Sequence, residues 1–462
     1  MPLVGEFHGT SGPIHTGFND TILPIDTDII KACDEVTGIT TKPADPWSGD
    51  HIGFYHTLGS VYRTGPDRGK RSYAARGYYE ANRARPNLKV LCESLINRVT
   101  LDDDNKRATG VVLTHGGQEY IVPAAREVIV CGGTIQSPQI LELSGIGDPA
   151  VLKAAGVECK VPNPAVGANV QDHSITLMVW EAQPNNLTMD CLHQLPEVMQ
   201  GAMTQYEQTK GGPLSCISSM QGFFPAKRVM SDTELASVIQ SIRDIKPTST
   251  FHEKQLAQII AHLESNHSAN LQLVLVPVTG NPEGIEHQRY VFPPREAGKP
   301  AGFTFALCLQ YPVARGSIHI DSADPTKHPV IQPNYAGHEA DAAVLGAALR
   351  WGDKVGMSHH LKTTVAKRSL PASSVDLQDL EQAKQAVHDN VLGEYHICGS
   401  VAMGDALDSR LRVKGVEGLR VADASIFPNN VSGNIQSSVY AVAEKAADLI
   451  KEDWAGREAS KL

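Results

Sequence analysis

The chain has 462 residues, 41% of them hydrophobic, and a formal net charge of −10. This length and apolar content are enough for a large core and predict two or three domains of ordinary size. Lys and Arg form no cluster, which argues against a nucleic-acid partner, because such binding depends on neutralising phosphates. The apolar runs are also too short to span a membrane.

The start of the chain and its cysteines further restrict the kind of protein that the sequence can encode. Residues 1–6 lack the basic and apolar regions of a signal peptide, so none is predicted and the compartment stays open. The eight cysteines are scattered without Cys-x-x-Cys spacing, which predicts buried free thiols and neither structural zinc nor a disulfide scaffold. The pair His359-His360 has no third ligand at metal spacing, so we expect solvated surface there and no metal site.

Strand and helix signals alternate in the first half of the chain. Residues 96–101, 110–113 and 127–131 are β-rich runs. Gly132-Gly133-Thr134 follows the third run, and a helix is predicted from an N-cap at Ser137 to Gly145. A strand that passes through glycines into a helix is typical of anion binding, because glycine lets a ligand approach the backbone and the helix N-terminus carries positive potential.

The middle of the chain, residues 174–390, mixes both kinds of element. Helices are predicted at 200–209 and 232–242, and strands at 271–276, 304–309 and 317–320. The string Gly145-Ile146-Gly147-Asp148-Pro149-Ala150 follows a helix and contains a proline, so it predicts a turn and not a dinucleotide fingerprint. With no Gly-x-Ser-x-Gly either, an NAD enzyme or a serine hydrolase fits poorly.

The residues best suited to chemistry lie near the end of the chain. His396 stands in the Gly/Ser-rich loop 394–404, and Asn434 directly precedes an amphipathic helix predicted over 438–451. Such an order can bring a titratable group and a hydrogen-bonding partner to one site, which proton transfer requires.

Six strings resemble the glucose–methanol–choline (GMC) family of FAD oxidoreductases. They are His8–Ile14, Gly133–Gly147, Val166–His173, Ala314–Pro325, Glu394–Gly404 and Val421–Pro428. Ile397 replaces the family's usual Pro and Ser400 its usual Thr. Asn434 takes the second catalytic position, which implies a His–Asn pair where many members have His–His.

The resemblance implies a mixed α/β fold. It consists of an incomplete FAD-binding Rossmann-like domain and a substrate domain with an antiparallel sheet flanked by helices. Residues 1–66 and 176–392 are expected to form the substrate domain, and residues 67–175 and 393–462 the FAD-binding part. The family's N-terminal strand–Gly-x-Gly-x-x-Gly–helix has no counterpart in this sequence, so we expect the chain to begin partway through the family's fold.

The resemblance also implies a reaction. An alcohol would be oxidised by hydride transfer to flavin N5, with His396 as acid/base and Asn434 hydrogen-bonded to the substrate oxygen. Ile96, Asp423, Gly433 and Asn434 would contact FAD. From the residues alone, Ile96 fits a hairpin edge equally well, and Asp423 fits a turn better than a cofactor contact.

Two other functions stay open. One is a GMC-fold lyase or cyclase, in which the histidine does acid–base work only; the other is a non-catalytic truncated product that holds no cofactor. The sequence implies a small-molecule partner but not its identity, the electron acceptor or the oligomeric state.

Overall fold

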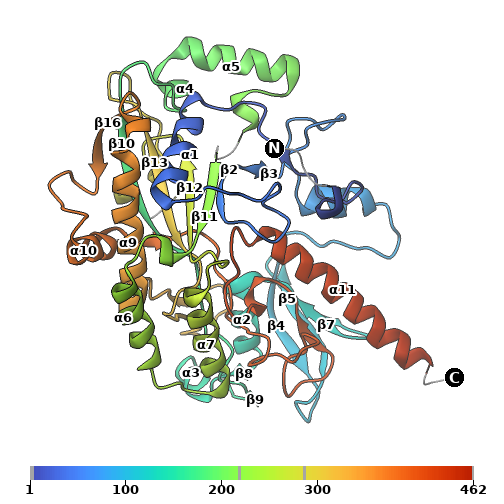
Figure 1. The fold of residues 1–462 in the computed structure, drawn as a ribbon. Helices are drawn as coiled ribbons and strands as arrows, with labels where there is room; N and C mark the ends of the chain where they lie inside the picture. Colours follow the sequence, from blue (N-terminus) through green and yellow to red (C-terminus); the bar gives the residue numbers. More distant parts are fainter. Residues whose placement is uncertain (1–4, 217–219, 285–287, 460–462) are drawn as a thin grey trace.

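The computed structural model describes residues 5–216, 220–284 and 288–459, so most of the segment 1–6 considered above lies outside the described residues. In Figure 1 a large sheet with its helices occupies one side of the molecule, and smaller sheets with the long C-terminal helix occupy the other.

The larger part is a seven-stranded antiparallel sheet in the order β16-β10-β13-β12-β11-β2, with β17 paired to one end of β10. Its strands are β2 (Gly53–His56), β10 (Ser174–Ala182), β11 (Met220–Phe224), β12 (Leu271–Val276), β13 (Gly302–Leu309), β16 (Val365–Leu370) and β17 (Leu392–Gly393). Strand β13 is buried along its whole length, because its alternate side chains enter two different apolar clusters. The predicted antiparallel sheet is confirmed.

Five helices pack beside this sheet: α1 (Pro24–Thr37), α6 (Asp232–Arg243), α7 (Thr250–Glu264), α9 (Glu339–Gly356) and α10 (Leu380–Asn390). Trp351 of α9 stacks on Phe54 of β2 at 5.6 Å between ring centroids. Its indole Nε1 donates a 2.9 Å hydrogen bond to Thr37 Oγ1 at the end of α1. Residues far apart in the sequence therefore share one core.

The smaller part contains the antiparallel sheet β4 (Ser94–Leu101), β5 (Ala108–His115) and β6 (Gln118–Pro123), and the parallel pair β7 (Val128–Val130) and β18 (Leu419–Val421). Helices α2 (Gly133–Leu143) and α11 (Gln436–Ala459) belong to this part. Leu141, Leu419 and Val421 are fully buried in its core. The prediction that the apolar run before Gly132 forms a parallel strand is confirmed by this pairing.

The structure has further strands and helices. They are β1 (Gly17–Phe18), β3 (Leu58–Gly59), β8 (Ile146–Gly147), α3 (Pro149–Ala154), β9 (Val161–Pro162), α4 (Cys191–Gln194), α5 (Pro196–Thr209), α8 (Gln288–Val291), β14 (Ser317–His319) and β15 (Val330–Gln332). The 3₁₀ helices are η1 (Gly5–Phe7), η3 (Pro213–Ser215), η4 (Ala226–Arg228), η5 (Pro282–Gly284), η6 (His359–Leu361) and η7 (Ala424–Ile426), and η2 (Ala75–Glu80) is a π-helix.

The start of α2 differs from the prediction. The helix begins at Gly133, four residues before the expected N-cap Ser137, and Pro138 lies inside it. Ser137 is buried and its hydroxyl hydrogen-bonds Gly132 and Asp423. The sequence could not reveal this, because Asp423 is a tertiary partner from the other end of the chain.

The prediction of buried free thiols is confirmed in part. All eight are free thiols, but only Cys33, Cys308 and Cys398 are buried. Among the helices of the described residues, none has the length and apolarity needed to cross a bilayer.

Gly222 in β11 gives a first testable prediction. A Cβ at this position would lie 1.9 Å from Cδ1 of Phe54, whose ring is buried against Trp351. Gly222→Ala should therefore lower the melting temperature, with a loss of about 1–3 kcal/mol from overpacking. The matched control is Gly201→Ala in α5, where nothing lies within 4 Å and alanine favours the helix. Equal melting temperatures for the two variants would contradict the prediction.

Candidate active site

The main chain around His396 is held by a buried carboxylate. The backbone N–H of His396 donates to Asp172 Oδ1 at 2.8 Å, and Tyr335 Oη donates to Asp172 Oδ2 at 2.8 Å. Burial raises the pKa of Asp172, and these two hydrogen bonds offset part of the rise. Tyr395, the residue before the histidine, has a φ of 64° and is exposed, so its side chain turns away as His396 turns inward.

The string Val166–His173 lies directly against the histidine loop. Gln171 and Cys398 exchange two backbone hydrogen bonds of 3.0 and 2.8 Å, and Asn169 Nδ2 donates to the Gly399 carbonyl at 3.2 Å. Gly399 has a φ of 88°, and a Cβ there would lie 2.6 Å from the Asn169 carbonyl oxygen. Only glycine fits this close approach, so two of the sequence motifs form one structural unit.

The structure places His396 and Asn434 side by side. Asn434 Nδ2 lies 3.1 Å from His396 Nε2. The other amide atom, Asn434 Oδ1, accepts from Gln221 Nε2 at 2.9 Å and from Gln272 Nε2 at 3.4 Å. Asn434 therefore donates to the imidazole, and His396 Nε2 acts as an acceptor. Because Asn434 is exposed, this side of the imidazole can be reached from solvent.

A second histidine and a glutamate stand behind His396. His173 Nδ1 lies 3.0 Å from His396 Nδ1, and Glu394 Oε2 lies 3.2 Å from His396 Nδ1 and 3.4 Å from His173 Nδ1. Burial opposes ionisation of Glu394, but the two imidazoles prevail and lower the pKa of its carboxyl to about 2. The glutamate therefore supplies a buried negative charge against the back of His396.

The neighbouring carbonyl determines where the protons lie. The carbonyl of Val431 accepts from His173 Nε2 at 3.0 Å, so this nitrogen carries a hydrogen and, when His173 is neutral, its Nδ1 is an acceptor. The hydrogen shared by the two Nδ1 atoms then belongs to His396. Neutral His396 is thus protonated at Nδ1 and keeps its lone pair at Nε2, on the side of Asn434.

Asp423 holds the glycine turn between β7 and α2. Its Oδ2 accepts from the Gly133 backbone N–H at 2.9 Å and from Ser137 Oγ at 2.5 Å, and its Oδ1 accepts from the Ser425 N–H at 2.8 Å. Both carboxylate oxygens are used by the protein itself. The structure therefore places Asp423 as the residue that fixes the turn.

The turn and the histidine loop are joined through Thr134. Its hydroxyl donates to the Ile397 carbonyl at 2.8 Å, and Ser400 Oγ donates to the Thr134 carbonyl at 2.6 Å. A change in the turn would therefore be transmitted to the main chain next to His396.

The remaining predicted site residues lie in different places. Gly433, next to Asn434, has a φ of 78°, and its N–H donates to Gln310 Oε1 at 2.5 Å. A Cβ on Gly433 would come within 3.5 Å of the Phe223 ring. Ile96 is half-buried in β4 opposite Leu113, and no hydrogen bond of the described residues joins it to His396, Asn434 or Asp423.

Sequence reasoning missed five residues that surround the His396–Asn434 pair. They are His173, Gln221, Gln272, Gln310 and Glu394. Glu394 lies two positions before His396, and His173 is the last residue of the family-like string Val166–His173, so the sequence contained a signal for both residues. The glutamines belong to or follow strands β11, β12 and β13 and carried no signal of their own.

Comparison with known proteins agrees with this geometry. Two profiles described as GMC oxidoreductase match residues 8–175 and 312–443. The chain is 36% identical over 464 residues to dehydrogenase mpl7 of Monascus purpureus, which covers 98% of this chain and 74% of the relative.

Solved structures share the fold. An FAD-dependent oxidoreductase from Chaetomium thermophilum superposes with a TM-score of 0.84 at 22% identity, over 98% of this chain and 76% of that one. A fungal aryl-alcohol oxidase gives a TM-score of 0.82 at 22% identity, over 97% and 74% of the two chains. The chain belongs to the GMC oxidoreductase family, whose members are FAD-dependent oxidoreductases.

Proposed function

We propose that this protein oxidises the CH–OH group of a small alcohol, with His396 as proton acceptor and Asn434 as hydrogen-bond donor to the substrate oxygen. The observation that carries the proposal is the unprotonated His396 Nε2, which accepts from Asn434 Nδ2 at 3.1 Å at a position bordered by the exposed Asn434. A substrate hydroxyl at this point meets a proton acceptor and an oxygen-binding amide together.

The residues present fit the family's cofactor. Gly133 has a φ of 75° with nothing within 4 Å of the position of a Cβ, so a ligand can approach its backbone. It opens helix α2 directly after the parallel strands, and Asp423, which accepts its N–H at 2.9 Å, holds the turn in this conformation. We propose that Ile96, Gly433 and Asn434 also border the cofactor, with residues 67–175 and 393–462 on its side and residues 1–66 and 176–392 on the substrate side.

When bound, FAD supplies the acceptor for the hydride that leaves the substrate carbon. The protein's own residues manage the proton. His396 Nε2 takes it from the hydroxyl, and the resulting imidazolium is stabilised by the Glu394 carboxylate, 3.2 Å from its Nδ1. Asn434 keeps the oxygen in place, since its own carbonyl is already fixed by Gln221.

The first experiment joins cofactor binding to activity. The purified chain is incubated with FAD, desalted and examined by visible absorption, then mixed without oxygen with primary aliphatic, aryl and sugar alcohols. We expect a retained flavin band that one alcohol class bleaches. A retained band that no alcohol bleaches would contradict alcohol oxidation and favour the lyase or cyclase alternative. Failure to retain FAD would favour a non-catalytic product.

The hydrogen bonds of Asp423 to Gly133, Ser137 and Ser425, here called the Asp423 clamp, give a second prediction, on cofactor retention. Asp423→Ala leaves the N–H groups of Gly133 and Ser425 and the Ser137 hydroxyl without their acceptor. The glycine turn should loosen, and we expect FAD affinity to fall by about tenfold or more, since one lost charged hydrogen bond is worth about 1.5–3 kcal/mol. Fluorescence titration with FAD measures it. The control is Asp103→Ala in an exposed turn, and equal affinity in both variants would refute the role of the clamp.

A further inference from the structure

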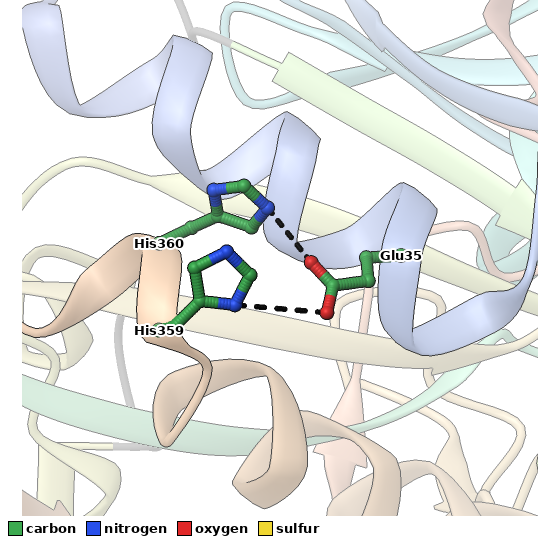
Figure 2. Close-up of side chains that lie close together, drawn as sticks. All are labelled: Glu35, His359 and His360. Atoms are coloured by element: carbon green, nitrogen blue, oxygen red, sulfur yellow. Dashed lines mark ion pairs between the residues drawn. The ribbon is translucent and has the colours of Figure 1, made fainter.

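A second group of metal-binding side chains lies away from the active site, at the junction of α1 and η6. Figure 2 shows the rings of His359 and His360 facing the carboxylate of Glu35. His360 Nε2 lies 2.8 Å from Glu35 Oε2, and His359 Nδ1 lies 3.6 Å from Glu35 Oε1. The sequence shows no third ligand at metal spacing beside this histidine pair, because Glu35 comes from a helix distant in the chain.

The backbone on both sides of this group is fixed. Glu35 lies in the last turn of α1, which is tied to α9 by the hydrogen bond from Trp351 to Thr37. On the other side, Ser358 Oγ accepts from the His360 backbone N–H at 3.3 Å, and Leu361 is fully buried. The three side chains thus start from anchored main chain, which lowers the entropy lost when they bind one ion.

The donor set matches a borderline divalent cation. One ligand atom from each side chain lies within 4.8 Å of the others. Ligands about 2.0–2.2 Å from a tetrahedral zinc are roughly 3.3–3.6 Å apart, so a small rotation of these partly exposed side chains brings them onto one ion. Two imidazoles with one carboxylate favour Zn²⁺, Co²⁺, Ni²⁺ or Cu²⁺ over Mg²⁺ and Ca²⁺, which prefer oxygen ligands. The side chains are 28% to 63% exposed, so an ion can enter and water can complete its coordination.

We propose that Glu35, His359 and His360 form a surface site for one divalent cation of the zinc class. The bound ion would link the end of α1 to the segment that follows α9. Because it binds the folded arrangement, it would stabilise the fold and raise the melting temperature.

Calorimetric titration of the chelator-treated protein with ZnSO₄ tests the proposal. We expect the wild type to bind one equivalent that is weakened about tenfold or more in His360→Asn, in His359→Asn and in Glu35→Gln. The zinc-dependent rise in melting temperature should disappear in the same variants. His267→Asn, an exposed histidine outside the group, is the matched control and should bind as the wild type does.

One competing site needs its own variant. His173, Glu394 and His396 also lie within metal-binding distance of one another. If His396→Asn abolishes the zinc isotherm while the His359→Asn/His360→Asn double variant keeps it, the ion binds in the active site and the proposal is overturned. No zinc binding by the wild type would overturn it as well. Loss only in the double variant supports it.

Discussion

Replacement of His396 by alanine should lower kcat/KM for alcohol oxidation by about 10²- to 10⁴-fold, the range that general acid–base groups contribute. The variant loses the nitrogen that accepts the hydroxyl proton, while Asn434 stays fixed by Gln221 and Gln272. Substrate binding should change less than turnover. Steady-state kinetics on the alcohol identified in the panel, per mole of bound flavin, measures the effect.

Two controls separate chemistry from folding in this variant. The flavin band and the melting temperature must stay close to those of the wild type, because removal of His396 leaves Glu394 facing only His173. His388→Asn, on the exposed face of α10, should leave kcat/KM unchanged. Near-normal turnover of a flavin-loaded His396→Ala protein would refute the assignment of this residue.

Glu394→Gln should have the second-largest effect, a loss of about 10- to 100-fold in kcat. The amide keeps the size of the side chain but removes the negative charge that faces His396 Nδ1 at 3.2 Å. The imidazolium formed during turnover loses its partner, so its formation costs more. Glu417→Gln, whose side chain is 75% exposed, is the matched control.

Stability supplies an independent test of the Glu394 charge. The pKa of its carboxyl falls to about 2 in the folded protein, below the ordinary 4.5, so its stabilising contribution is full above pH 4.5 and is lost as pH falls toward 2. As pH falls from 4.5 toward about 2, the free energy of unfolding, measured with urea, should fall more in the wild type than in Glu394→Gln. Parallel curves of the free energy of unfolding against pH would show that Glu394 is not ionised beside His396.

Local pattern was sufficient for most of the fold. The alternating or continuous apolar runs predicted β4, β5, β12 and β13 correctly, because each run is buried by its own sheet. Motif resemblance also led to His396 and Asn434, which the structure brings within 3.1 Å of each other.

What the sequence did not predict depends on tertiary partners. The start of α2 shifted because Asp423 binds Ser137 and Gly133. The carboxylate at His359-His360 comes from α1, and no spacing rule connects residues that only folding brings together. The role of Ile96 stays a prediction, since its strand pairing is that of any hairpin edge.

The hydrogen bonds around the active site have one direction from end to end. Each member donates to the next: the Gly433 N–H to Gln310, and then in turn Gln310, Gln272, Asn434, His396, His173 and the Val431 carbonyl. The first donor and the last acceptor are peptide groups of one short loop, and a peptide group cannot exchange its N–H for its C=O. The loop 431–433 therefore imposes the tautomer of His396, and the three amide side chains between them do not titrate. In neutral His396, the nitrogen that receives the substrate proton is therefore determined by the main chain of this loop.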